Sequence, residues 1–200
     1  MSYDAALEKA LEEIKEIVPY AAANKSGAEY DGSKFRVPLF ERSFLVHFPD
    51  GRVEEENSSA PPPQWLQLLL LHYLAQAKGN SPAEDWVTYR QLPGASFFEG
   101  RFGKMSTEPL LRAFGNDLES FKRAALALKG TPMTRTGDAA FRFMALPKIP
   151  MACILYLGEE EMPPSINVLF DAAAPTYLPT EDLSYLGLYL ALGLKQRKNG

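Results

Sequence analysis

Cysteine and histidine are scarce in this sequence: its 200 residues include one cysteine and two histidines. A lone Cys153 cannot form an internal disulfide, and its place in an apolar run is more typical of a buried side chain than of a nucleophile. Metal sites need several His, Cys or carboxylate ligands at suitable spacing, whereas His47, His72 and Cys153 lie far apart in the sequence. The sequence therefore predicts no metal site, no iron–sulfur motif and no resident cofactor.

Long apolar runs and clustered positive charge are also lacking. The most apolar run, from Trp65 to Ala77, contains Gln67 and His72 and is well short of the roughly 20 residues that span a bilayer. The formal net charge is −4, and the lysines and arginines form no basic stripe of the kind that binds a phosphate backbone. The first residues form an acidic amphipathic stretch, unlike a secretion signal. We therefore expect a cytoplasmic protein that binds neither nucleic acid nor a membrane.

What the sequence does contain is enough apolar residues for a large core. Hydrophobic residues make up 46% of the chain, with 12 Phe and 9 Tyr among them. A chain of this length buries about 70% of its unfolded surface when it folds. No internal repeat and no linker divides the sequence, so we predict one domain over residues 1–200.

Apolar residues recur with the helical period in some segments and with the strand period in others. This pattern predicts an α+β fold, with a small, mostly antiparallel sheet packed against about five helices. Helical spacing predicts a first helix that ends before Pro19, a central helix over 63–78 that is apolar all round, two helices separated at Gly115-Asn116, and a C-terminal helix over 180–196. Alternating apolar residues and short runs of β-prone residues predict strands over 34–53, 86–89, 140–145, 151–157 and 166–170.

Three details of this prediction concern single positions. The segment from Ala21 to Lys34 mixes Gly, Ser, Asp and Asn and is predicted to be a loop. Thr180 is predicted to cap the C-terminal helix. Within that helix, the small residues Gly187 and Ala191 predict a close approach by another element.

The segment from Arg90 to Gly103 is the best candidate for a ligand-binding loop. Its glycines permit close backbone approach, its arginines can hold an anion, and its phenylalanines can stack on a ligand. It has neither the spacing of a phosphate-binding loop nor a dinucleotide-binding glycine motif. An ordinary packed surface loop would explain the same residues. The residues that carry the binding prediction are Arg90, Gly94, Phe97, Phe98 and Arg101.

Three carboxylates form a second candidate site. Asp171 ends a predicted strand, while Glu181 and Asp182 begin the C-terminal helix. Around one cleft they could act as acid and base together with Arg90 or His72. Ordinary structure also explains them, because Asp after a strand starts turns and acidic residues favour the first turn of a helix. His72, on an apolar helical face, is typical of a core histidine with one nitrogen hydrogen-bonded.

Several phrases, in order along the chain, together resemble a known family. They are Ser26–Tyr30, Leu71–Leu74, Trp86–Gly94, Ala145–Pro150, Asn167–Asp171 and Tyr177–Leu183. The likeness runs over nearly the whole chain. The family that it resembles is the prokaryotic one catalogued as domain of unknown function 3786.

This resemblance implies a metabolic context but no reaction. Members of the family look common in anaerobes, and some carry an added cysteine-rich iron–sulfur module of the kind found beside corrinoid and one-carbon proteins. The resemblance therefore implies an auxiliary role in such metabolism. Because this chain lacks the cysteine-rich module, any cluster would have to lie on a partner, such as an iron–sulfur or corrinoid protein. No catalytic residue can be carried over from the family.

These observations give one main hypothesis about function. We expect a non-catalytic accessory or binding module that recognises a protein partner or a small anionic ligand through residues 90–103 and 171–182. The alternative is a small hydrolase or transferase in which the three carboxylates act with Arg90 or His72. A third hypothesis is self-association through an open edge of the antiparallel sheet.

Overall fold

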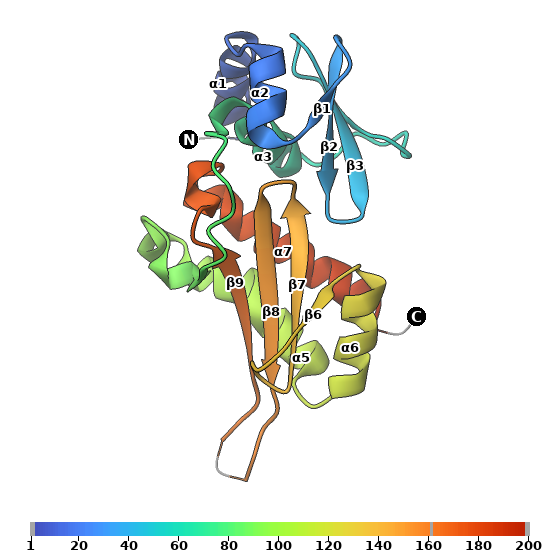
Figure 1. Cartoon of the computed structure of the whole chain (residues 1–200), viewed down its shortest axis with the longest axis vertical. Coiled ribbons are helices and arrows are strands. Elements are labelled where there is room, and N and C mark those ends of the chain that lie inside the picture. The colour runs from blue at the N-terminus through green and yellow to red at the C-terminus, as the bar shows by residue number, and fades with distance from the viewer. Residues whose placement is uncertain (1–2, 161, 199–200) are drawn as a thin grey trace.

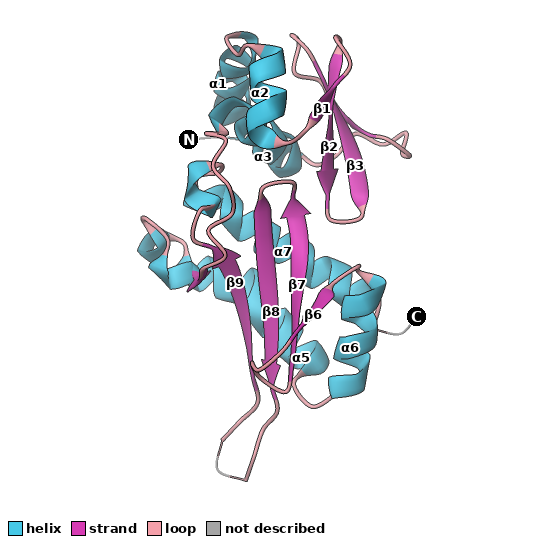
Figure 2. Cartoon of the chain, viewed as in Figure 1, coloured by secondary structure: helices cyan, strands magenta, loops and turns pink. Residues whose placement is uncertain are grey.

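A computed structural model of the chain describes residues 3–160 and 162–198 (Figure 1). It is an α+β protein, as predicted, and its strands form two antiparallel sheets of four and five strands (Figure 2). The helices are α1 Tyr3–Lys15, α2 Pro19–Ser26, α3 Gln64–Gln76, α4 Glu99–Phe102, α5 Glu108–Phe114, α6 Leu118–Ala127 and α7 Thr180–Gln196. The strands are β1 Glu29–Tyr30, β2 Lys34–Leu39, β3 Arg42–His47, β4 Val53–Glu55, β5 Trp86–Thr88, β6 Thr131–Met133, β7 Ala139–Leu146, β8 Ile149–Tyr156 and β9 Ser165–Asp171.

The first sheet has the order β1-β2-β3-β4 and packs with α1, α2 and α3 in the upper part of Figure 1. Burial alternates along β2, so that Phe35, Val37 and Leu39 are fully buried. Phe44 and Val46 of β3 are buried in the same way. This alternation is the sequence pattern that predicted the strands.

The predicted loop from Ala21 to Lys34 is partly wrong, because its first six residues belong to α2. The helix begins with Pro19, whose fixed φ suits a first turn. It ends at Gly27, whose φ of 74° is left-handed and whose N–H bonds back to the carbonyl of Ala23. The prediction gave too much weight to the polar residues and too little to the run of alanines at 21–23.

The second sheet has the order β5-β9-β8-β7-β6, with α5 and α7 behind it in Figure 1. Its central strand β8 is buried from Ile149 to Leu155 and pairs with β7 on one side and β9 on the other. Cys153 lies in this strand with no exposed surface, and burial raises the pKa of its thiol. This agrees with the prediction of a buried, unreactive cysteine.

All four edge strands of the two sheets are short. β1 has two residues, and β4, β5 and β6 have three each. Short edges offer few unpaired backbone groups to another chain. The fold therefore gives little support to the hypothesis of self-association through a sheet edge.

The first sheet with helices α1 to α3 and the second sheet with helices α4 to α7 form two halves of the molecule. These halves meet through backbone and side-chain contacts. Phe40, in the β2–β3 turn, donates its N–H to the carbonyl of Ala145 in β7 at 2.8 Å. The Tyr73 hydroxyl of α3 donates to the carbonyl of Ser26 at 2.6 Å and accepts the N–H of Lys148 at 3.1 Å. Helices α3 and α7 also pack together across this junction.

Helix α7 begins differently from the prediction. Pro179 occupies the N-cap position, and Thr180 is the first helical residue. The Thr180 hydroxyl donates to the carbonyl of Pro93 at 2.6 Å instead of capping its own helix. The predicted close approach is confirmed at Gly187, where an added Cβ would lie 2.4 Å from the ring of Phe102.

Candidate functional site

Residues 90–103 form a series of short turns on a buried base. A 3-10 turn over Tyr89–Gln91 is closed by the side chain of Gln91, whose Oε1 accepts the N–H of Thr88 at 2.8 Å. A second 3-10 turn covers Ala95–Phe97 and leads into α4. The φ of Gly94 is 70°, a left-handed conformation that favours glycine between the two turns. Local hydrogen bonds therefore define the path of this segment, which we call the docking loop (residues 90–103).

Two aromatic rings hold the docking loop against the second half of the molecule. Tyr89 and Phe102 are buried and stacked, with ring centroids 4.1 Å apart and planes 4° from parallel. The Tyr89 hydroxyl donates to the carbonyl of Thr180 at 3.0 Å. Burial raises the pKa of Tyr89 to about 12, so this phenol stays neutral and keeps donating. The ends of the loop are thus fixed to the start of α7.

The middle of the docking loop projects into solvent. Phe97 is 86% exposed, and the side chain of Arg90 is 80% exposed. Gly94 is exposed as well, whereas Phe98 is partly buried. Arg90 faces Glu99 at 3.8 Å, a separation at which an exposed ion pair contributes little. The loop therefore presents an aromatic ring and a guanidinium outward on a fixed base.

Arg101, the other arginine of the docking loop, is already engaged within the protein. Its Nη1 lies 3.1 Å from a carboxylate oxygen of Glu181, and its Nη2 hydrogen-bonds the hydroxyl of Tyr185. Its guanidinium also lies over the Tyr185 ring, 4.6 Å from the centroid. Arg101 and Glu181 thus connect α4 to the first turn of α7, and the arginine predicted to bind an anion is occupied by a carboxylate of the same chain.

Asp171 lies at the end of β9 and is fully buried. Its two carboxylate oxygens accept the N–H groups of Ala83, Glu84 and Ala173 at 2.8, 2.8 and 2.9 Å. These partners are backbone groups, and two of them belong to the connection that follows α3. Asp171 therefore links the connection after α3 to the second sheet through these hydrogen bonds.

Asp182 is the carboxylate that the structure brings to His72. His72 Nδ1 and Asp182 Oδ2 are 2.6 Å apart, and the two side chains are only 18% and 6% exposed. Beside them on the same two helices, the rings of Trp65 and Tyr185 are stacked with centroids 5.1 Å apart. Within the described residues, no hydrogen bond engages His72 Nε2. The pair has the arrangement of a histidine oriented by a carboxylate.

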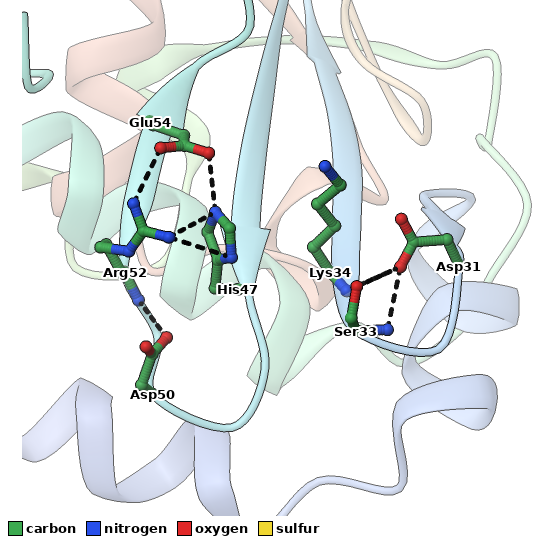
Figure 3. A network of polar contacts seen from close by, with 7 residues as sticks. All are labelled: Asp31, Ser33, Lys34, His47, Asp50, Arg52 and Glu54. Atoms are coloured by element: carbon green, nitrogen blue, oxygen red, sulfur yellow. Dashed lines mark hydrogen bonds and ion pairs between the residues drawn. The ribbon is translucent and has the colours of Figure 1, made fainter. Parts of the chain in front are cut away.

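A polar network on the first sheet was not predicted as a site (Figure 3). His47 Nε2 lies 2.7 Å from Glu54 Oε1, and Arg52 Nη1 donates to Glu54 Oε2 at 2.9 Å. The hydrogen bond with His47 lowers the pKa of Glu54. The turn signature at 49–52 could have predicted this network. The turn closes a hairpin in which the N–H of His47 donates to the carbonyl of Arg52, so the two residues lie opposite each other. The ion pair between Arg52 and Glu54 and the contact of His47 with Glu54 link the two strands at the β3–β4 turn.

The other part of Figure 3 is a turn closed by Asp31. Its Oδ1 accepts the hydroxyl of Ser33 at 2.8 Å and the N–H groups of Ser33 and Lys34 at 2.9 Å each. The Ser33 hydroxyl bond is the main cause of the lowered pKa of Asp31. Oδ1 of Asp31 therefore closes the turn that leads into β2.

Neither a metal centre nor a membrane span is found in the described part of the chain. Over residues 3–160 and 162–198, no group of three or more His, Cys, Asp or Glu side chains is placed to hold a metal ion. No helix in those ranges has both the length and the apolar character that crossing a membrane requires.

Comparison with known proteins defines a family and nothing narrower. The family model described as "Domain of unknown function (DUF3786)" matches residues 19–192. The chain therefore belongs to this family, as the phrases in its sequence indicated. Neither the curated proteins nor the solved structures include a match.

Proposed function

We propose that this chain is a non-catalytic accessory module that binds a protein partner through its docking loop. The observation that carries the proposal is the 86% exposure of Phe97 on a loop whose base is fixed by buried rings. Exposed aromatic residues on a preorganised surface lose little entropy on binding. Aromatic and arginine side chains also dominate the energetic centres of protein interfaces. Phe97 and the neighbouring Arg90 are the residues that we assign to such a centre.

The geometry favours a protein partner over a small anionic ligand. An anion would need Arg90 and Arg101 to converge, but Arg101 is engaged with Glu181 and Tyr185. Phe97 projects outward instead of lining a cleft. The surface that complements it is an apolar pocket with carboxylates at its rim, which would take the ring of Phe97 and pair with Arg90.

The family resemblance supports one class of partner. An iron–sulfur or corrinoid protein of anaerobic one-carbon metabolism, in the cytoplasm, is the partner that we propose to test first. This chain would act beside such a protein without holding the cluster itself, because its one cysteine is buried in β8.

Phe97→Ala is expected to reduce recovery of the partner at least about tenfold, since removing an interface hot spot costs about 2 kcal/mol or more. The measurement is quantitative mass spectrometry of proteins retained by the tagged chain from an anaerobic lysate, with iron and cobalt determined in the same eluate. Leu126→Ala is the matched control, because Leu126 is a 55% exposed apolar residue on α6. Equal recovery with both variants would argue against the docking loop.

A specific contact supports an enzyme as the second candidate function. The 2.6 Å contact between His72 and Asp182 orients the imidazole and favours a proton on Nδ1, which leaves Nε2 able to accept a proton. A small hydrolase or transferase would use His72 as a general base at this position. Glu181 precedes Asp182 in the first turn of α7, and Arg101 of α4 pairs with it.

If this second candidate is correct, His72→Gln should lower kcat by about 100-fold or more, as expected for the loss of a general base. The assay is a panel of nitrophenyl esters and phosphate esters, followed at constant pH. His47→Gln is the control, because His47 belongs to the surface network of Figure 3. Activity that survives in His72→Gln, or a wild-type chain without activity on the panel, would count against the enzyme.

A further inference from the structure

A cavity of about 150 Å³ lies where three distant parts of the sequence meet. Its lining comes from the β2–β3 turn, the first turn of α3 and the C-terminal half of α7. The cavity is therefore at the junction of the two halves, and such junctions are common places for ligand sites. Apolar cavities of about this volume admit a benzene-sized ring. None of its residues belongs to the docking loop.

The walls of this cavity are aromatic and aliphatic. Trp65 and Tyr189 line it, with Leu192 at the solvent side, where it is 44% exposed. Both rings are held by their neighbours: Trp65 stacks on Tyr185 at 5.1 Å and Tyr189 on Phe40 at 5.5 Å. A planar ring can stack against fixed rings of this kind without having to order them first.

The charged side chains at the cavity are already paired. Arg42 makes a two-point contact with the carboxylate of Glu55 and donates through Nη1 to the hydroxyl of Tyr189 at 3.1 Å. Glu41 Oε1 accepts from Arg197 Nη2 at 2.5 Å. The two cations and two anions balance. A charged ligand would therefore introduce a charge without a counterion, which favours a neutral ligand.

Two polar groups at the cavity still have hydrogen-bonding capacity. Glu41 Oε2 is buried, and no donor in the described residues reaches it. A buried acceptor without a donor raises the free energy of the folded state. The amide of Gln196, at the exposed end, makes no hydrogen bond with the described residues. The carboxamide of Gln196 can donate to a ligand carbonyl and accept from an adjacent ligand N–H in a two-point contact.

We infer that this cavity binds a small, neutral, planar aromatic molecule that carries an N–H donor beside a carbonyl, as in an amide or a lactam. The ring lies against Trp65 and Tyr189, and the polar edge faces the carboxamide of Gln196. A carboxylate in place of the amide would lose the N–H that Gln196 can accept and would bring a negative charge to a cavity whose cations are already paired. The site therefore discriminates by charge between molecules of one shape.

The test compares benzamide with its charged isostere benzoate, using calorimetry and ligand-observed NMR on the full chain. We expect benzamide to bind with a dissociation constant on the order of 1 mM. Benzoate is expected to bind at least about tenfold more weakly, because its charge lacks a partner. Equal affinities for the two, or no binding of benzamide at several times that concentration, would overturn the proposal.

Two variants locate the binding. Leu192→Trp fills the cavity from its exposed side and should abolish benzamide binding, while Leu126→Trp makes the same change on α6 and should leave it intact. Gln196→Ala should weaken benzamide several-fold and leave the melting temperature unchanged, since Gln196 is exposed. Benzamide binding that is unaffected by Leu192→Trp would place the ligand elsewhere and refute the assignment.

Discussion

An Asp171→Ala substitution is expected to lower the free energy of unfolding by about 3 kcal/mol. The carboxylate is fully buried and accepts three backbone N–H groups, from Ala83, Glu84 and Ala173. Hydrogen bonds to a charged group are stronger than neutral ones, and their loss leaves backbone donors without partners. The measurement is equilibrium unfolding in urea, with the slope against denaturant compared between variant and wild type.

Asp138→Ala is the matched control for this effect. Asp138 is exposed and accepts one backbone N–H, from Leu157 at 2.7 Å. Its removal should cost less than about 1 kcal/mol. Similar losses for the two variants would mean that the three bonds of Asp171 contribute no more than a single surface bond, contrary to the structure.

A Gly187→Val substitution is expected to destabilise the protein by about 2–3 kcal/mol and to displace the base of the docking loop. A Cβ at position 187 would lie 2.4 Å from Phe102 Cε2 and 3.1 Å from Ser106 Oγ. Phe102 cannot move freely, because it is buried and stacked on Tyr89. The partner should therefore bind more weakly to this variant even under conditions where the variant is folded.

Gly100→Ala separates this clash from the general effect of adding a methyl group. Position 100 is in α4, and a Cβ there would have no neighbouring atom within 4 Å. Its thermal midpoint and partner binding should match those of the wild type or exceed them slightly, since alanine favours a helix. Matching losses in Gly100→Ala and Gly187→Val would show that the contact between α7 and Phe102 is not tight.

Much of the local structure could be predicted from the sequence. Alternation over Phe35–Leu39 predicted β2, and the run from Trp65 to Leu74 predicted a buried helix over 63–78, which the structure has as α3 over 64–76. These patterns depend on neighbouring residues alone, because the period of apolar side chains follows from backbone geometry. The break between α5 and α6 was predicted for the same reason, from Gly115-Asn116.

The division into two sheets could not be predicted in this way. Strand pairing brings β5 beside β9, which follows it by more than seventy residues, and no local pattern specifies that choice. The helix α2 was missed because its propensity comes from alanines within an otherwise polar segment. Both the pairing of distant strands and the formation of a helix in such a segment depend on tertiary contacts.

The candidate sites show the same limit. The sequence grouped three carboxylates with Arg90 or His72 without choosing among them, and it did not pair Arg101 with Glu181. The structure pairs Arg101 with Glu181 and Asp182 with His72, across segments about 80 and 110 residues apart. These partners are close only because α7 packs against both α3 and α4. The role of a charged side chain therefore depended on contacts that the sequence does not reveal.

The most direct test of the proposed function is a photo-crosslinking amino acid placed at position 97, with the same residue at position 126 as the control. Both positions carry exposed apolar side chains, but only Phe97 is on the docking loop. In cells of the native host, the account predicts one discrete covalent adduct from position 97 and none from position 126. No adduct from position 97, or the same adducts from both positions, would contradict it.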